Sequence, residues 1–304
     1  MEQYLQQILD ELRAIRRLLE QGGGKLVASS TATTKQNVQS SSVVPQSFSL
    51  RTHSAGKYLG CYLKERNLVI LEAEDIDTNE SEKREYFQVA HLIGQYYDVS
   101  REMLDALRRA FQSSEAVEID AKKFNSEEKN KIAVICDKLR KLGILEVFDR
   151  VRTGRRVSKF TCKVRGLPHD YSYLLGGWFE LYVAQEVRRI LAGKAPLVLR
   201  GVKLMELQDF PSNHFEIDVL FVVQSKTGYS VGVIECKSGK NVNTSQVRQQ
   251  IWNITSMLQL RTQQTAVVMP NSPSETRRQN CLEQIGVQCF GLSELNEFLR
   301  GMVQ

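Results

Sequence analysis

Residues 213–240, NHFEIDVLFVVQSKTGYSVGVIECKSGK, place charged side chains inside two apolar runs that otherwise have the composition of buried strands. The first run carries Glu216 and Asp218, and the second ends in Glu235 and Lys237. Side chains alternate between the two faces of a strand, so each pair is expected to share one face. Because burying unpaired carboxylates is costly, the two strands are expected to bring these charges together at one polar site.

The same alternation makes the opposite face of each strand apolar. It places Ile217 and Val219 opposite Asp218, and Cys236 opposite Glu235. This is the pattern of strands that pack against a core on one side. Both strands are therefore expected in the centre of a domain, with the charged residues near the strand ends.

The predicted site has the chemistry of a divalent-metal centre. Asp218, Glu235 and the backbone carbonyl of Cys236 offer the hard oxygen ligands that Mg²⁺ and Mn²⁺ prefer. Lys237 beside them is expected to orient an attacking water and to offset phosphate charge. In outline this is a site for metal-assisted hydrolysis of a phosphodiester.

From residue 171 onward the hydrophobic pattern alternates between helical and strand periods. The expected order of elements is αβββαβαβα, which is a mixed α/β fold class. The expected helices are residues 171–193, 244–261, 274–286 and 292–302, and the expected strands are residues 196–205, 215–223, 230–236, 265–270 and 287–291.

EID followed by IECK, after a helix that carries Glu180 in GGWFEL, resembles the PD-(D/E)xK (restriction-endonuclease-like) nuclease superfamily. The core of that family is αβββαβ around a mixed central sheet. The resemblance implies that Glu180, Asp218, Glu235 and Lys237 are the catalytic residues. It also implies that Asp218, Glu235, Glu180 and the Cys236 carbonyl hold Mg²⁺ or Mn²⁺.

Within that superfamily, the motifs look closest to the nuclease domain of CRISPR-associated ancillary nucleases activated by cyclic oligoadenylates. The likeness covers roughly residues 165–304, and it implies a role in defence against foreign nucleic acid. Those proteins carry an N-terminal Rossmann-like sensor domain. Residues 1–80 show no βαβ array, so no cyclic-nucleotide sensor is expected in them.

Three further polar residues are candidates for supporting the site. Gln246 and Gln250 are four residues apart and share one face of their predicted helix. Glu216 is expected either beside the metals or in solvent. Other hydrolytic chemistries lack their motifs, since the sequence contains no H-E-x-x-H, G-x-S-x-G or Walker A pattern.

The N-terminal part of the chain is expected to contain a helix and a linker. Residues 1–21 form an amphipathic helix with heptad spacing. Its apolar positions are Leu5, Ile8, Leu12, Ile15 and Leu19. So short a coiled coil is marginal alone, and two roles stay open: self-association, or docking on the same chain. Residues 22–50, rich in Gly, Ser, Thr and Gln, are expected to be a flexible linker.

Residues 51–166 are expected to form a winged-helix-like α+β module. Residues 55–73 are compatible with short strands or with helix ends. Three helices follow, each opened by a serine suited to capping (Ser81, Ser100 and Ser126), and then a hairpin turns at Thr153-Gly154. This order of elements is that of a winged helix.

The hairpin is basic and is predicted to bind nucleic acid phosphates. The candidate residues are Arg150, Arg152, Arg155, Arg156 and Lys159. The preceding helix adds further cations that a recognition helix would present to the major groove: Lys129, Lys131, Lys138, Arg140 and Lys141. The alternatives are a solvated charged surface or a module for protein contacts.

The net charge and the cysteines limit the kinds of protein that this sequence can encode. The net charge of +6 mildly favours a polyanionic partner. The six cysteines form no C-x-x-C pair, so a zinc ribbon is not expected. The sequence shows neither a signal peptide nor an apolar run long enough to span a bilayer, so we expect a cytoplasmic protein with reduced thiols and no membrane association.

The sequence as a whole predicts a metal-dependent endonuclease, a hydrolase of phosphodiester bonds with DNA favoured over RNA as its substrate. A homodimer is the default expectation, because closed dimers are the commonest oligomers. Two alternatives from other classes stay open. One is a non-catalytic winged-helix DNA-binding regulator whose nuclease-like domain serves dimerisation or sensing. The other is an interaction subunit that works through its N-terminal heptads.

Overall fold

The predicted heptad helix (1–21) and almost all of the predicted linker (22–50) lie outside the residues that the structure describes. The computed structural model describes residues 50, 53–77, 81–207, 214–239 and 244–303. Their secondary structure and packing are given below.

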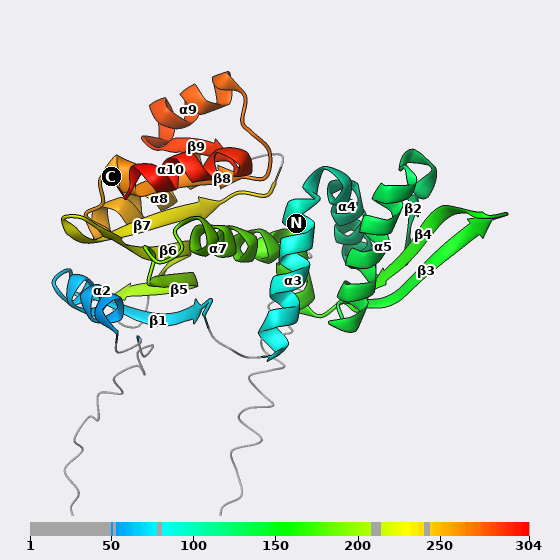
Figure 1. Cartoon of the computed structure of the whole chain (residues 1–304), viewed down its shortest axis with the longest axis horizontal. Helices are drawn as coiled ribbons and strands as arrows, with labels where there is room; N and C mark the ends of the chain where they lie inside the picture. Colours follow the sequence, from blue (N-terminus) through cyan, green and yellow to red (C-terminus); the bar gives the residue numbers. More distant parts are fainter. Residues whose placement is uncertain (1–49, 51–52, 78–80, 208–213, 240–243, 304) are drawn as a thin grey trace, which may run out of the picture. The chain divides into compact units, whose positions relative to one another are not determined.

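A six-stranded mixed sheet positions the predicted site (Figure 1). In spatial order its strands are β1 (Leu68–Asp75), β5 (Leu197–Glu206), β6 (His214–Ser225), β7 (Gly228–Cys236), β8 (Thr265–Met269) and β9 (Gln288–Gly291). The pairings from β1 to β7 are antiparallel, and β7–β8 and β8–β9 are parallel. The α/β fold class with a mixed central sheet is therefore confirmed.

Helices cover both faces of this sheet. They are α6 (Pro168–Ser172), a π-helical turn (Tyr173–Gly177), α7 (Trp178–Ile190), α8 (Thr244–Leu258), α9 (Glu275–Ile285) and α10 (Leu295–Gly301). One apolar cluster joins Phe221 and Ile234 of the sheet to Phe179 and Val183 of α7. A second cluster lies on the other face and includes Ile254 of α8. The predicted order αβββαβαβα is present from α7 onward.

The strand alternation predicted around Asp218 is wrong at one position. Ile217 packs in the second cluster together with Leu220, whereas Val219 packs in the first cluster. An odd spacing between Ile217 and Leu220 on one face requires a local break in the pleat. Gly201, on the neighbouring strand between the residues paired with Val219 and Ile217, has a φ of +56°, a conformation that glycine adopts without strain.

The N-terminal boundary of the predicted winged-helix-like module also differs from the structure. Residues 54–75 form α2 (Ser54–Lys64) and β1, and β1 pairs with β5 at the edge of the large sheet. Leu59 of α2 and Ile70 of β1 are buried in the second apolar cluster. This segment therefore belongs to the sheet that carries the site. The apolar runs YLGCYL and NLVILEAE alone did not distinguish the two assignments.

The helical module has three helices and a three-stranded antiparallel sheet. Its elements are α3 (Ser81–Gln95), α4 (Tyr97–Ser113), β2 (Val117–Asp120), a 3₁₀ turn (Ala121–Lys123), α5 (Ser126–Lys141), β3 (Leu145–Thr153) and β4 (Arg156–Val164), with strand order β2-β4-β3. The hairpin turns at Gly154, whose φ is +63°. The three helices and the hairpin match the predicted order, and β2 is an addition to it.

Two of the predicted helix caps are wrong. The N-cap of α5 is Asn125, whose side chain accepts from the Glu128 amide at 3.0 Å, so Ser126 is the first helical residue. Ser100 lies inside α4 and is buried, and its hydroxyl donates to the Ile93 carbonyl at 3.1 Å. A serine hydroxyl can hydrogen-bond to a backbone carbonyl inside a helical region as well as to the amides at a helix start, so Ser100 did not mark a helix start.

The helical module and the large sheet share one apolar cluster, which runs from Ile93 and Leu107 to Val187 and Phe221. Helices α3 and α7 approach closely at Gly94. A Cβ at this position would lie 2.5 Å from the ring of Tyr182. In a close-packed interior, so short a contact forces the ring or the helix backbone to shift.

Gly94→Ala is therefore expected to destabilise the protein by about 1–3 kcal/mol through overpacking, despite the higher helix propensity of alanine. The measurement is the free energy of unfolding by urea. Gly301→Ala is the matched control, because no neighbouring atom lies within 4 Å of its new Cβ. Equal stabilities of the two variants would contradict the close packing of α3 on α7.

The cysteines depart from the expectation of reduced thiols. Cys281 of α9 and Cys289 of β9 form a disulfide with their Cα atoms 6.2 Å apart. The other three buried cysteines, Cys136, Cys162 and Cys236, are free thiols. No described helix combines the length and apolar character that crossing a bilayer requires.

Candidate active site

Asp218 of β6 and Glu235 of β7 lie in contact at the centre of the predicted site. The Cys236 amide donates a hydrogen bond of 2.6 Å to Asp218 Oδ2, and the charge of Asp218 acts on the neighbouring carboxyl group of Glu235. Glu235 is fully buried, and its Oε2 has no hydrogen-bond partner among the described residues. An unsatisfied oxygen in such a place is costly unless something else binds it.

Lys237 is the cation nearest to this pair. Its ammonium donates to Glu235 Oε1, and its side chain is 26% exposed, so it connects the buried carboxylates to solvent. Burial disfavours the charged amine, but the Glu235 carboxylate outweighs burial and raises the pKa of Lys237. Lys237 is therefore held as an ammonium beside the carboxylates, as the sequence predicted.

Glu180 belongs to the same electrostatic group. It lies in the first turn of α7, directly after the π-helical turn. Burial, followed by the charge of Asp218, raises the pKa of Glu180 to about 7. Arg200 of β5 opposes this rise, and its Nη1 donates to the Gly177 carbonyl at 3.1 Å, which ties the start of α7 to the sheet. The structure thus brings all four predicted catalytic residues together.

The site carries more negative than positive charge. After burial, the charge of Asp218 raises the pKa of both Glu180 and Glu235, and Glu216 adds to the rise at Glu180 and at Asp218. Among the described side chains, the cations that oppose these rises are Arg200 at Glu180 and Lys237 at all three groups. Burial, together with the charge of Asp218, raises the pKa of Glu235 to about 8. At Glu235, burial therefore outweighs the opposing charge of the Lys237 ammonium bound to it.

The Asp218–Glu235 pair fits a divalent cation on two observations. Its oxygens are hard ligands, and Glu235 Oε2 is buried without a partner among the described residues. The described part of the chain contains no group of three or more His, Cys, Asp or Glu side chains placed to hold a metal ion. The fit therefore rests on this pair, and the parts of Glu180 and the Cys236 carbonyl in the metal site stay predictions.

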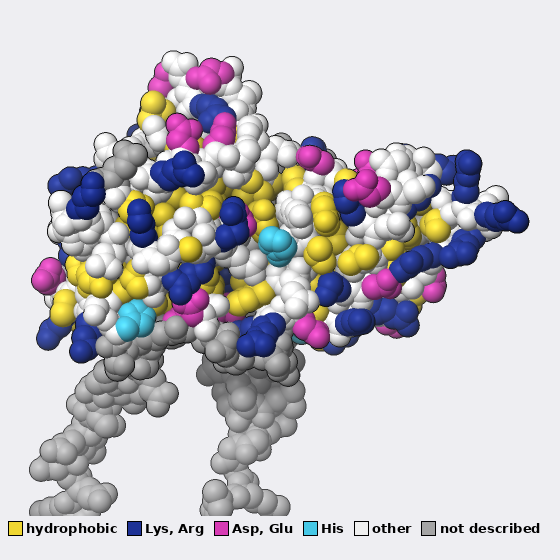
Figure 2. All heavy atoms as spheres, viewed as in Figure 1, with side chains coloured by type: hydrophobic (Ala, Val, Ile, Leu, Met, Phe, Trp, Pro, Cys, Tyr) yellow, Lys and Arg dark blue, Asp and Glu magenta, His cyan; other side chains and the backbone are white. Residues whose placement is uncertain are grey.

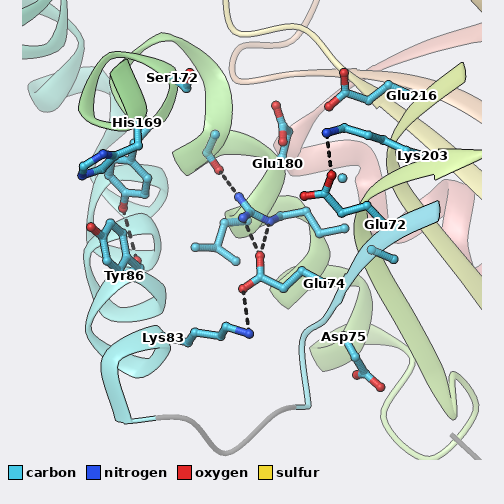
Figure 3. Close-up of a pocket in the computed structure, with 16 residues that line it drawn as sticks. Glu72, Glu74, Asp75, Lys83, Tyr86, His169, Ser172, Glu180, Lys203 and Glu216 are labelled. Atoms are coloured by element: carbon cyan, nitrogen blue, oxygen red, sulfur yellow. Dashed lines mark hydrogen bonds and ion pairs between the residues drawn. The ribbon is translucent and has the colours of Figure 1, made fainter. Parts of the chain in front are cut away.

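A cleft of about 980 Å³ is lined by Glu180 and Glu216, among other residues (Figure 3). On its β1 side, Glu74 binds Arg200, whose Nε donates to Oε2 at 2.8 Å, and Glu72 binds Lys203 at 2.6 Å. The sequence did not indicate these contacts. The opposite charges of EAED in β1 and RGVK in β5 could have predicted these contacts, but only if the two strands had been known to pair.

The predicted supporting residues lie in different surroundings. Glu216 is exposed, lines the cleft and raises the pKa of Glu180 and Asp218, so it lies near the carboxylates. Gln246 is exposed and Gln250 partly exposed on α8. A supporting role for these two glutamines stays a prediction.

Some cations of the basic β3–β4 hairpin are paired with carboxylates of the protein, and others are exposed without such a partner among the described residues. Arg150 is paired with Asp137, and Lys159 with Glu118 at 2.8 Å. Figure 2 shows Lys and Arg side chains gathered over the end of the β3–β4 hairpin. Three predicted residues near the turn are exposed and form no ion pair with another described residue: Arg152, Arg155 and Arg156. Their binding to nucleic acid stays a prediction.

Some cations of the predicted recognition helix, α5, are already engaged within the protein and are therefore less available to nucleic acid than those of the hairpin. Lys131 of α5 binds Glu127 at 2.7 Å and lies 4.5 Å from the centre of the Tyr96 ring. Lys138 donates to Gln88 of α3 at 2.9 Å. Two of the five candidate cations on this helix therefore already have partners within the protein.

No model of a known protein family matches the sequence, and no curated protein does. The solved structures that align with it include protein VC1899 from Vibrio cholerae, with 14% identity and a TM-score of 0.49, and Can2 from Sulfobacillus thermosulfidooxidans in complex with cyclic tetra-adenylate, with 17% identity and a TM-score of 0.48. Each alignment covers 79% of this chain and 59% of the other, so the chain spans less than two thirds of either protein.

Proposed function

We propose that the protein is a divalent-metal-dependent endonuclease that hydrolyses phosphodiester bonds, with DNA favoured as its substrate. The observation that carries the proposal is the fully buried Glu235, which is bound by Lys237 and lies beside the partly buried Asp218. Burying the Glu235 carboxylate with one oxygen unpaired among the described residues, next to a second carboxylate, costs stability. Such a group is therefore a candidate for function, and Lys237 beside it reaches solvent.

Each residue then has a chemical part. Asp218 and Glu235 would hold the metal, and Asp218 is already fixed by the Cys236 amide. Bound Mg²⁺ or Mn²⁺ supplies a water of lowered pKa and positive charge for the phosphate oxygens. Lys237 places an ammonium where it can orient the nucleophilic water and offset the charge of the transition state. Glu180, with its pKa near 7, exchanges a proton readily at neutral pH.

The other expectations are parts of the same proposal. The exposed arginines of the hairpin supply contacts to nucleic acid phosphates outside the site. A homodimer would place two sites on one duplex, and defence against foreign nucleic acid is the process in which we expect the enzyme to act.

A cleavage assay tests the function. We expect cutting of at least one of supercoiled plasmid, linear duplex, single-stranded DNA and RNA with Mn²⁺ or Mg²⁺, and none with EDTA. Inactivity on all four substrates in both metals, with DNA still bound through the hairpin, would favour the non-catalytic regulator instead. That alternative also predicts DNA binding that is indifferent to EDTA and to Asp218→Ala.

A further inference from the structure

Two hollows of opposite charge flank the carboxylate site. The larger cleft beside Glu180 is lined by five carboxylates, Glu72, Glu74, Asp75, Glu180 and Glu216, against three Lys or Arg side chains. A smaller hollow of about 240 Å³ lies on the Lys237 side. Its lining includes the cations Arg101, Lys237 and Arg277 and, among the described residues, no Asp or Glu. A polyanionic strand is therefore favoured on the Lys237 side.

Two of these cations have no ionic partner among the residues that the structure describes. Arg101 of α4 and Arg277 of α9 are partly exposed, and neither guanidinium forms an ion pair with another described residue. The neighbouring Arg278 differs, because it forms an ion pair with Glu294. Guanidinium groups that converge on one hollow without a carboxylate have the chemistry of a phosphate site.

The hollow is built on fixed groups. Tyr97, on its wall, stacks on Trp178 with the ring centres 5.6 Å apart. The Ser238 hydroxyl donates to the Leu175 carbonyl at 2.8 Å, which ties the residue after Lys237 to the π-helical turn. Little reorganisation is needed before a ligand binds, so more of the contact energy appears as affinity.

Building on the proposed nuclease function, we propose that this hollow binds the substrate phosphate adjacent to the scissile one, with Arg101 and Arg277 as its ligands. Lys237 lines the hollow and also binds Glu235, so it connects the phosphate subsite to the buried carboxylate pair. The substrate strand then leaves the site over α4 and the start of α9, away from the acidic cleft.

The first test measures binding without cleavage. Full-length protein is titrated in EDTA into a fluorescein-labelled single strand and into its duplex. Arg101→Gln and Arg277→Gln are each expected to raise Kd by about tenfold, because a charge-assisted contact is lost. Each is also expected to reduce the slope of log K against log salt by about 0.7 on the single strand. Arg109→Gln, an exposed arginine on the same helix as Arg101, is the matched control and is expected to leave both values unchanged.

A second test places the subsite on the substrate. Single neutral methylphosphonate linkages are introduced one at a time along the strand. Wild type is expected to lose affinity when the linkage next to the cut is neutral, and the Arg101→Gln/Arg277→Gln variant is expected to lose nothing further there. Equal losses for the variant at every linkage would overturn the proposal.

The outcomes separate this inference from the function on which it rests. Metal-dependent cutting with unchanged Kd in the double variant overturns the subsite and leaves the nuclease. Arginine-dependent binding without cutting under any condition refutes the nuclease, and with it the position of the subsite next to a scissile phosphate, and leaves the hollow as a phosphate-binding site. Losses as large for Arg109→Gln show general surface attraction, and the absence of any binding by wild type also overturns the subsite.

Discussion

Asp218→Asn is expected to reduce metal-dependent cleavage by about a thousandfold or more while the protein stays folded. The substitution removes the negative charge that would hold the cation. Groups that only hydrogen-bond to a metal ligand are worth about 10–100-fold, and a residue that binds the metal directly is expected to matter at least as much. The amide oxygen of asparagine can still accept the hydrogen bond from the Cys236 amide, which is 2.6 Å long in the native protein. The measurement is the single-turnover cleavage rate in Mn²⁺, alongside the thermal unfolding midpoint.

Glu216→Gln is the matched control for charge. Glu216 lies on the same strand and near the same carboxylates but is exposed, so its replacement is expected to change the rate by less than about tenfold. Calorimetric titration with Mn²⁺ adds a readout that does not depend on turnover, and binding is expected only in proteins that retain Asp218. An Asp218→Asn variant that cuts at the wild-type rate would remove this residue from the mechanism.

The four site residues were predictable from the sequence on three different grounds. Glu235 and Lys237 are two residues apart at the end of a strand, so any strand conformation brings them to one face, and the structure pairs them directly. Asp218 needed one further step, the pairing of β6 with β7, which the short connection between the two runs implies. Glu180 depended on the resemblance to a nuclease family rather than on the pattern of its own helix.

The groups that surround the site were not predictable, because each depends on contacts distant in sequence. Arg200 binds Glu74 only because β1 joins the sheet beside β5, 126 residues away along the chain. The hollow formed by Arg101 and Arg277 requires α4 and α9 to meet at Lys237. The break in alternation near Asp218 lies opposite Gly201 of the neighbouring strand, whose positive φ no residue pattern reports.

Stability of the metal-free protein is expected to fall as pH rises toward 8 and beyond. Burial, followed by the charge of Asp218, raises the pKa of Glu235 from 4.5 to about 8, so the folded state binds one more proton than the unfolded state between these values. The contribution of this proton to stability is complete below about pH 4.5 and is lost as pH passes through about 8. With each pKa unit equivalent to about 1.4 kcal/mol, the loss is on the order of a few kcal/mol.

Glu235→Gln isolates this effect, because glutamine has the shape of the protonated carboxyl group and cannot ionise. The variant should match wild type in unfolding free energy near pH 5 and exceed it near pH 9, as measured by urea denaturation in EDTA. A smaller decline should remain in the variant, since Glu180 titrates near pH 7. Adding Mn²⁺ at pH 9 should restore the stability of wild type and leave Glu235→Gln unchanged, because a cation at Asp218 and Glu235 replaces the lost proton. Parallel pH profiles for the two proteins would mean that Glu235 is ionised and satisfied throughout, and the case for a site in need of a metal would then fail.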